Sequence, residues 1–331
     1  MGQRLSSNLY RRLRGYVIVL LLVAMCAVTW ALNPKFASLA NFSNILVQCT
    51  PIAIGACGMT FVMIAGGFDL SVGSIAAMAG MVAASIAIQA YRPEDPMPAE
   101  KATHMAYLAA LGVGLALGWI NGTLITRIRI NPFVTTLGTM LMVRSLVEVY
   151  SGGGKPITLP TDDPLGALAW TAAWGVPTPI LLLLATVLVS AAALRWTRFG
   201  YYCYALGGNE RASWLSGINT DGAKRLTYVL AGGAAGLAGL VVLSRVSQAE
   251  PTAATGYELD VIAAVIIGGT PLGGGTGSMS GSLVGVLTLA VINNLLTFLN
   301  VDPSLQKMVK GAIIVGAVGI DSLYRARAEN R

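Results

Sequence analysis

The apolar residues of this chain lie in long continuous runs, separated by short segments rich in glycine, proline or polar residues. A helix needs about 20 mostly apolar residues to cross the hydrocarbon core of a bilayer, and most of the runs approach that length. The pattern predicts an all-α fold: a polytopic membrane helical bundle of about ten transmembrane helices. The predicted spans are residues 16–32, 44–65, 72–90, 105–126, 133–150, 178–194, 226–243, 260–269, 280–299 and 307–320.

Two of these predicted spans differ from the others. Residues 16–32 follow Arg11, Arg12 and Arg14, and a basic start of this kind also fits a signal peptide. Because further apolar runs follow directly, we expect an uncleaved first helix. Residues 260–269 are too short for an ordinary span and lead into a glycine-rich stretch, which predicts a short, broken eighth span. No second soluble domain fits the pattern, so we expect residues 1–331 to form a single transmembrane domain.

The composition agrees with a membrane protein. Only 11% of the residues are charged, whereas about a quarter are charged in a soluble domain, and 55% are hydrophobic. This low fraction of charged residues and high fraction of hydrophobic residues exclude a soluble enzyme, a disordered chain and an ordinary nucleic-acid binder. The 22 Lys and Arg residues give a formal net charge of +7. Most of them fall in the two termini and in alternate loops, so the positive-inside rule predicts that both termini are cytoplasmic. Because orientation accounts for the basic excess, we expect no nucleic acid to be bound.

Residues with catalytic potential are scarce. The single histidine, His104, lies at a loop edge, and the four cysteines are too scattered for a metal site or a disulfide framework. The stretch 152–156 resembles a phosphate-binding loop only superficially, because its first glycine would fall on Val149 and Pro156 follows Lys155. We therefore expect no catalytic residue, no metal and no cofactor bound by this chain. If ATP drives its activity, the ATPase must be another chain.

Asp69 is the most informative single residue, because a carboxylate at membrane depth is a functional candidate by default. The alternative is a carboxylate favoured by the dipole at the start of the following helix. The neutral polar residues of the spans suit a hydroxylated solute better than an ion, although hydrogen bonds between helices explain many of them equally well. The candidate pathway residues are Asp69, Asn121, Thr135, Thr136, Asn293 and Asn294.

Several contacts inside the bundle are also predicted. Glycines recur at four-residue spacing, which permits close approach of helix backbones in lipid. Arg144 and Glu148 lie four residues apart and are expected to neutralise each other on one helix face. The glycine-spaced sets are Gly114, Gly118 and Gly122; Gly232 and Gly236; and Gly277, Gly281 and Gly285.

Two glycine-rich segments resemble each other. Residues 64–74 (IAGGFDLSVGS) and 267–278 (IGGTPLGGGTGS) each follow an apolar run and begin another. Transporters often contain internal repeats with broken helices at the repeat interface. The match is short and biased by glycine, so both an internal repeat and a chance similarity remain open.

The long segment 195–225, predicted to be cytoplasmic, has a pattern of its own. Gly207 and Gly208 are expected to break a helix, and Asn209 is a good N-cap. Residues 210–215 favour a short helix that ends near Gly217. A short helix held between two spans suits docking of a soluble partner.

Four stretches carry a resemblance to a known family. They are GGFDLSVGS (66–74), INPFVTTLGTM (130–140), TRFGYYCYALGGNERASWLSGI (197–218) and ELDVIAAVIIGGTPLGGGTG (258–277). With them, nearly the whole chain resembles the permease subunit of bacterial sugar ABC importers of the ribose/arabinose/xylose/galactose type. The family pattern usually has Gly-Arg after the Phe and a second Ala before Leu-Ser-Gly. This chain departs from it with Gly200-Tyr201 and Ser213-Trp214.

The resemblance implies a division of labour. This chain would translocate a monosaccharide or a similar small polyhydroxylated solute across the bacterial inner membrane. A partner ATP-binding subunit with tandem domains would hydrolyse ATP, a periplasmic sugar-binding protein would deliver the solute, and a second permease copy would complete a homodimer in the lipid membrane. The implied ATPase-docking residues are Ala205, Gly207, Gly208, Asn209, Glu210, Ala212, Ser213 and Gly217. The alternative is a self-contained, ion-coupled secondary transporter.

Overall fold

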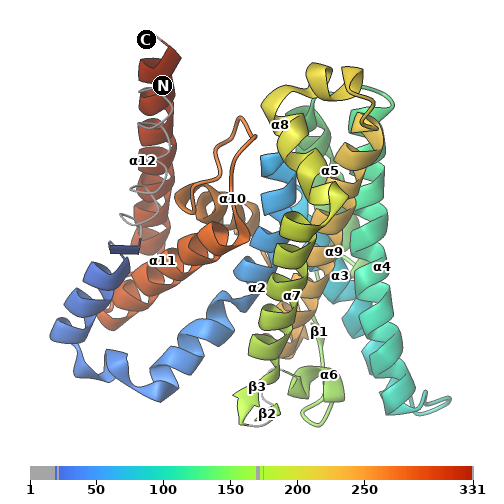
Figure 1. Cartoon of the computed structure of the whole chain (residues 1–331). Coiled ribbons are helices and arrows are strands. Elements are labelled where there is room, and N and C mark those ends of the chain that lie inside the picture. Colours follow the sequence, from blue (N-terminus) through green and yellow to red (C-terminus); the bar gives the residue numbers. More distant parts are fainter. Residues whose placement is uncertain (1–18, 21, 169–171, 174, 330–331) are drawn as a thin grey trace.

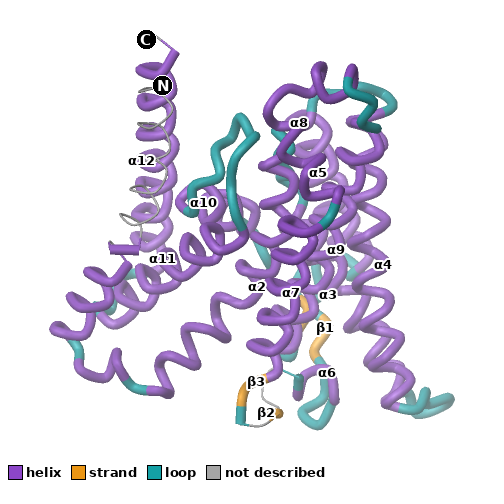
Figure 2. Tube along the Cα trace, viewed as in Figure 1, coloured by secondary structure: helices purple, strands orange, loops and turns teal. Residues whose placement is uncertain are grey.

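The computed structural model describes residues 19–20, 22–168, 172–173 and 175–329, and within them helices dominate (Figures 1 and 2). The expected all-α membrane bundle is confirmed. The long helices are α2 (Leu39–Ile64), α3 (Val72–Ala87), α4 (Ala99–Thr126), α5 (Pro132–Tyr150), α7 (Thr178–Trp196), α8 (Arg198–Leu215), α9 (Thr220–Val246), α10 (Tyr257–Ile267), α11 (Met279–Phe298) and α12 (Pro303–Glu329). The short elements are η1 (Pro34–Ala37), η2 (Ile88–Tyr91), α6 (Pro164–Ala167) and the strands β1 (Ile157–Thr158), β2 (Ala172–Ala173), β3 (Val176–Pro177) and β4 (Gln248–Ala249).

The helices follow the predicted spans closely. Among the described residues, 7 helical stretches are long and apolar enough to cross a membrane: α2, Val72–Tyr91, α4, α5, α7, α9 and α11. The short span predicted at 260–269 is α10, a helix of 11 residues. Of the predicted first span, Leu22–Leu32 is a shorter apolar helix, and residues 16–18 and 21 lie outside the described residues.

Several helices begin earlier than hydropathy predicts. Helix α2 begins at Leu39 behind the N-cap Ser38, whose side chain accepts the N–H of Asn41. Helix α9 begins at Thr220 behind the N-cap Asn219. Polar first turns are invisible to a hydropathy pattern, although the caps that begin them are readable.

The core of the bundle is formed by α2, α3, α4, α9 and α10, together with buried residues of α7 and α11. Helices α4 and α9 touch through their backbones, because a Cβ on Gly114 would overlap the carbonyl oxygen of Gly232. A Cβ on Gly118 would likewise overlap the carbonyl oxygen of Tyr228, and one on Gly236 would lie 2.5 Å from that of Ala110. The close packing predicted from glycine spacing is therefore confirmed for these two helices.

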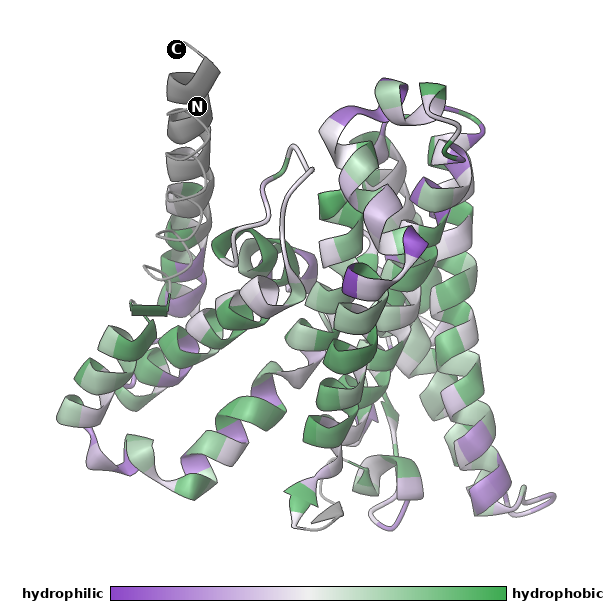
Figure 3. Ribbon diagram, in the orientation of Figure 1, coloured by the Kyte–Doolittle hydropathy of each residue, from purple (hydrophilic) through white to green (hydrophobic). Residues whose placement is uncertain are grey.

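The bundle has two ends of different character. The α8 face carries α8, the end of α4 and the beginnings of α5 and α9, and the β face carries the four short strands (Figure 1). Strand β4 pairs with β1 in antiparallel register, Ala249 opposite Ile157, and β2 pairs with β3. Hydrophobic residues predominate along α4, α7 and α9, whereas polar residues appear in α8 and at the start of α4 (Figure 3).

Candidate functional site

Helix α8 on the α8 face contains a break at the predicted N-cap. Asn209 has extended backbone angles (φ −162, ψ 104), and its side chain accepts the N–H of Ala212 at 2.9 Å. The short helix that follows Asn209 ends before Gly217 (φ 81), and the N–H of Ile218 donates to the carbonyl of Ser213 at 3.2 Å. The predicted cap at Asn209 and stop at Gly217 are both confirmed.

The predicted break at Gly207 and Gly208 is wrong. Both glycines are helical, and the helix is interrupted only at Asn209. Gly207 is required for a different reason, because a Cβ there would overlap the carbonyl oxygen of Ile64 at the end of α2. A close approach between backbones explains this glycine better than helix breaking does.

The short helix after Asn209 presents two large apolar side chains to its surroundings. Trp214 is 64% exposed and Leu215 is 71% exposed. Neither residue was among the predicted docking residues, although a Trp-Leu pair within the otherwise largely polar stretch 208–217 is a readable signal. Of the predicted docking residues, Gly208, Asn209, Ala212 and Gly217 are exposed, Ala205, Gly207 and Glu210 are partly buried, and Ser213 is buried.

Ionic contacts tie this surface to the bundle. Lys224 in the first turns of α9 donates to Glu210 at 2.6 Å. Arg129, in the connection between α4 and α5, pairs with Asp221 of α9 at 3.2 Å. Both pairs connect to the beginning of α9, so the short helix and the α4–α5 connection share one anchoring element.

The two similar glycine-rich segments end their preceding helices in the same way. After α2, Gly66 (φ 82) and Gly67 donate to the carbonyls of Met63 and Val62 at 3.0 and 2.9 Å. After α10, Gly269 and Thr270 repeat these bonds with Ile266 and Val265 at 2.9 and 3.1 Å, and Gly269 has a φ of 96. Both ends are Schellman motifs. The local similarity between the segments is therefore structural as well as sequential.

Asp69 lies in the break between α2 and α3 and is fully buried. Its Oδ1 accepts the backbone N–H of Ser71 at 2.8 Å and the Ser71 hydroxyl at 2.5 Å. Asn121 donates to the Ser71 hydroxyl oxygen at 2.8 Å, and Thr139 donates to Asn121 at 2.7 Å. The carboxylate thus stabilises the start of α3 and begins a polar chain through α4 to α5. Its Oδ2 has no hydrogen-bond partner among the described residues.

The other candidate pathway residues do not form one cluster with Asp69. Thr135 and Thr136 donate within their own helix, to Asn131 and Pro132 at 3.1 and 2.9 Å. Asn294 of α11 makes a reciprocal amide pair with Asn41 of α2, with distances of 3.1 and 3.3 Å. The Oδ1 of its neighbour Asn293 is buried and has no partner within the described part of the chain.

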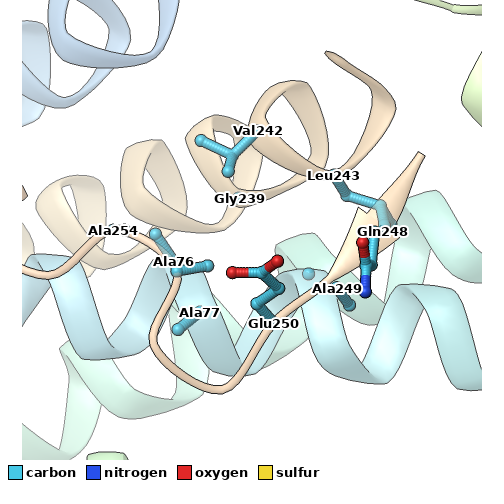
Figure 4. Close-up of a pocket in the computed structure, with 11 residues that line it drawn as sticks. Ala76, Ala77, Gly239, Val242, Leu243, Gln248, Ala249, Glu250 and Ala254 are labelled. Atoms are coloured by element: carbon cyan, nitrogen blue, oxygen red, sulfur yellow. The ribbon is translucent and has the colours of Figure 1, made fainter. Parts of the chain in front are cut away.

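Arg144 has a different partner from the predicted one. Its Nη1 donates to the carbonyls of Pro251 and Ala253, both at 2.8 Å, and so holds the connection between β4 and α10 against α5. No ion pair with Glu148 forms among the described residues. The same connection packs on α3 and α9, where the carboxylate of Glu250 lies in a pocket between Ala76, Val242 and Ala254 (Figure 4).

Glu258, at the start of α10, was also missed by the sequence analysis. Its Oε2 is buried without a partner in the described chain, and it occupies the space that a Cβ on Gly73 would fill. On the same helix, Asp260 pairs with Lys310 of α12 at 2.9 Å. Helix α10 therefore carries one buried carboxylate oxygen without a partner in the described chain, and one ion pair. A carboxylate placed two residues before the predicted start of a span was the available signal.

A membrane bundle with two glycine-broken helix pairs and a capped short helix at one face has the architecture of a transport permease. The chain belongs to the family described as "Branched-chain amino acid transport system / permease component", whose model matches residues 41–318.

Individual relatives refine the picture. The chain is 42% identical over 303 residues to the ribose import permease protein RbsC of Escherichia coli (strain K12), covering 91% of each chain. It is 34% identical over 321 residues to the galactose/methyl galactoside import permease protein MglC of the same strain, covering 95% of each chain. With the L-arabinose transport system permease protein AraH of that strain it is 33% identical over 321 residues, which is 95% of this chain and 90% of the relative. No solved structure matches the chain.

These matches confirm the resemblance stated from the four sequence stretches. All four stretches lie within residues 41–318, which the family model matches. The relatives are named for ribose, a pentose, and for galactose, a hexose, so permeases of this similarity serve more than one sugar.

Proposed function

We propose that this chain is the membrane-spanning permease subunit of an ATP-binding-cassette importer that carries a monosaccharide or a similar small polyhydroxylated solute across the bacterial inner membrane. The observation that carries the proposal is 42% identity, over 91% of both chains, to a ribose import permease. Relatives named for arabinose and galactose support the class of solute without selecting one sugar.

The proposed partners follow from the two faces. The α8 face docks a separate ATPase, with tandem nucleotide-binding domains, through the short helix after Asn209. The β face receives a periplasmic sugar-binding protein, and a second copy of the chain completes the pathway. Arg127, Arg195, Arg198 and Arg211 at the α8 face support a cytoplasmic location for it and for both termini. We also retain about ten spans in one permease domain over residues 1–331.

The proposed pathway runs beside the polar chain that begins at Asp69. The hydroxyl and amide groups of these hydrogen-bonded side chains can replace the water molecules that a polyhydroxylated solute loses on binding. Asn121, Thr135 and Thr136 line this side of the proposed pathway, and Asn293 and Asn294 contribute from α11. The buried, unpartnered Oδ2 of Asp69 is the observation that favours the alternative, an ion-coupled transporter, because a free carboxylate oxygen is a coupling-ion ligand.

Affinity purification of a tagged chain from gently solubilised membranes tests the docking proposal. The wild-type chain is expected to bring down a P-loop ATPase. Replacing Trp214 by Ala removes an exposed aromatic anchor and should lower ATPase recovery by about tenfold, which corresponds to ~1.4 kcal/mol. The matched control is Trp119→Ala, because Trp119 is 54% exposed on α4 and lies about two turns before the end of that helix at the α8 face. A chain that comes out alone and carries solute without ATP would contradict the proposal.

A further inference from the structure

Three segments distant in sequence meet at Gly207. A Cβ on this residue would overlap both the carbonyl oxygen of Ile64 and the backbone nitrogen of Gly275. The N–H of Gly275 donates to that same carbonyl at 2.8 Å, and a Cβ on Gly274 would lie 2.6 Å from the nitrogen of Gly66. We call this contact between Gly207 and residues 64–66 and 273–275 the glycine junction.

The junction joins the part of α8 that directly precedes the proposed docking helix to both helix breaks at once. Residues 64–66 contain the Schellman turn of α2 that leads to Asp69, and residues 273–275 lie in the break between α10 and α11. Tyr204, one turn before Gly207, adds a hydrogen bond from its hydroxyl to the carbonyl of Gly277 at 2.8 Å. Burial raises the pKa of Tyr204, so the hydroxyl keeps its proton and remains a donor at neutral pH.

The loop side of the junction contains glycines with positive φ. Gly66, Gly274 and Gly275 have φ values of 82, 73 and 77, which glycine alone adopts without strain. Gly207, in contrast, lies within a regular helix. A residue with helical backbone angles therefore contacts two glycine-rich loops, and a displacement of α8 at Gly207 reaches both loops through direct backbone contact.

We propose that Gly207 is the positioning residue through which α8, moved by the docked short helix after Asn209, sets the conformation of both helix breaks, so that the glycine junction couples ATPase docking to solute movement. The proposal rests on the function proposed above, because it takes the short helix after Asn209, which follows Gly207 in α8, as the ATPase-docking helix. Gly208, the next residue, has a separate role. A Cβ there meets nothing within 4 Å, and the residue is exposed on the partner-facing side.

The test uses the complete transporter, permease with ATPase and binding protein, reconstituted in lipid vesicles. Gly207→Ala keeps the helix but adds a methyl group inside the junction. The expected result is normal recovery of the ATPase with about tenfold less solute taken up per ATP hydrolysed. The control is Gly112→Ala on the exposed surface of α4, where a Cβ also meets nothing within 4 Å, and its ratio should equal that of the wild type. Gly208→Ala alters only the partner contact, so any loss of uptake should match its loss of ATPase recovery.

A second variant keeps the test decisive if Gly207→Ala fails to assemble. Tyr204→Phe removes the bond to Gly277 without adding volume and should lower uptake per ATP by about threefold with the ATPase still bound. Ratios equal to that of Gly112→Ala in the assembled variants would overturn the role of the junction alone. Failure of the wild-type chain to recover an ATPase would overturn the function proposed above, and the coupling role with it.

Discussion

Two contacts in this molecule depend on glycine but differ in structure: the contact between α4 and α9, and the glycine junction. In both, glycine allows backbones to touch: Gly114 against Gly232 in the first, and Gly207 against Ile64 and Gly275 in the second. Helices α4 and α9 are continuous, and their backbone hydrogen bonds are internal. In the junction, a hydrogen bond runs between the segments, from Gly275 to Ile64, and the loop glycines have positive φ.

The difference shows how one packing device serves both a fixed and an adjustable contact. Separating α4 from α9 requires moving a whole helix out of the core, against dispersion contacts along its length. Rearranging the junction breaks the hydrogen bonds from Gly275 and Tyr204 and rotates loop glycines, for which the steric cost of new backbone angles is small. The first contact should therefore govern folding, and the second should govern transport.

The largest effect is expected at the fixed contact. Gly118→Leu would drive a side chain into the backbone of α9 and should destabilise the folded chain by about 3 kcal/mol or more. Thermal unfolding in detergent and the yield of folded protein measure the loss. Gly112→Leu on the same helix is the control, because no atom lies within 4 Å of a Cβ there. Equal stability of the two variants would remove the distinction between fixed and adjustable contacts.

A second large effect is expected where α5 holds the connection before α10. Arg144→Met removes both hydrogen bonds to Pro251 and Ala253 and should cost about 2–3 kcal/mol, since bonds to a charged donor are the stronger kind. Chemical unfolding of the purified chain measures the loss. Arg92→Met, in an exposed loop, should change stability by less than about 0.5 kcal/mol. If the two variants were equally stable, Arg144 would have no anchoring role.

A smaller effect is expected along the polar chain from Asp69. Asn121→Ala leaves the hydroxyls of Ser71 and Thr139 without their amide partner and should cost about 1–2 kcal/mol. Thr135→Val loses only a bond within its own helix and should cost about 0.5 kcal/mol or less. Unfolding midpoints of the two variants measure the difference. If Thr135→Val lowered the midpoint more than Asn121→Ala, the hydrogen bonds of Asn121 would not stabilise the fold as we expect.

The smallest effect is expected at the cap of the short helix. Asn209→Ala removes the bond to the N–H of Ala212 and should cost about 1 kcal/mol, whereas Asn209→Ser keeps a capping oxygen. Hydrogen exchange in residues 210–215 reports the change directly. Faster exchange in the Ser variant than in the Ala variant would argue against capping.

Local signals in the sequence were sufficient for much of this structure. Apolar runs placed the helices, four-residue glycine spacing identified the face between α4 and α9, and Asn209 and Gly217 marked the ends of the short helix. Each of these features depends on residues that are neighbours in one helix or one turn.

Features that depend on distant segments were not predictable in this way. The break expected at Gly207 lies at Asn209 because Gly207 is needed against Ile64, more than 100 residues away in sequence. Arg144 turns from Glu148 to two carbonyls of the connection before α10, which no helical spacing reveals. The buried position of Glu258 could not be predicted, because its carboxylate fills the space left by the missing side chain of Gly73 on another helix.

Solute uptake into sealed vesicles tests the central claim, that this chain is the permease of an ATP-driven importer, most directly. The purified chain is reconstituted with and without its co-purified ATPase, and radiolabelled ribose, arabinose and galactose are offered with their binding protein. We predict uptake of at least one sugar that requires both ATP and the ATPase and is indifferent to ion gradients. Uptake by the chain alone, without ATP and driven by a sodium or proton gradient, would contradict the claim and would make Asp69 the first residue to replace.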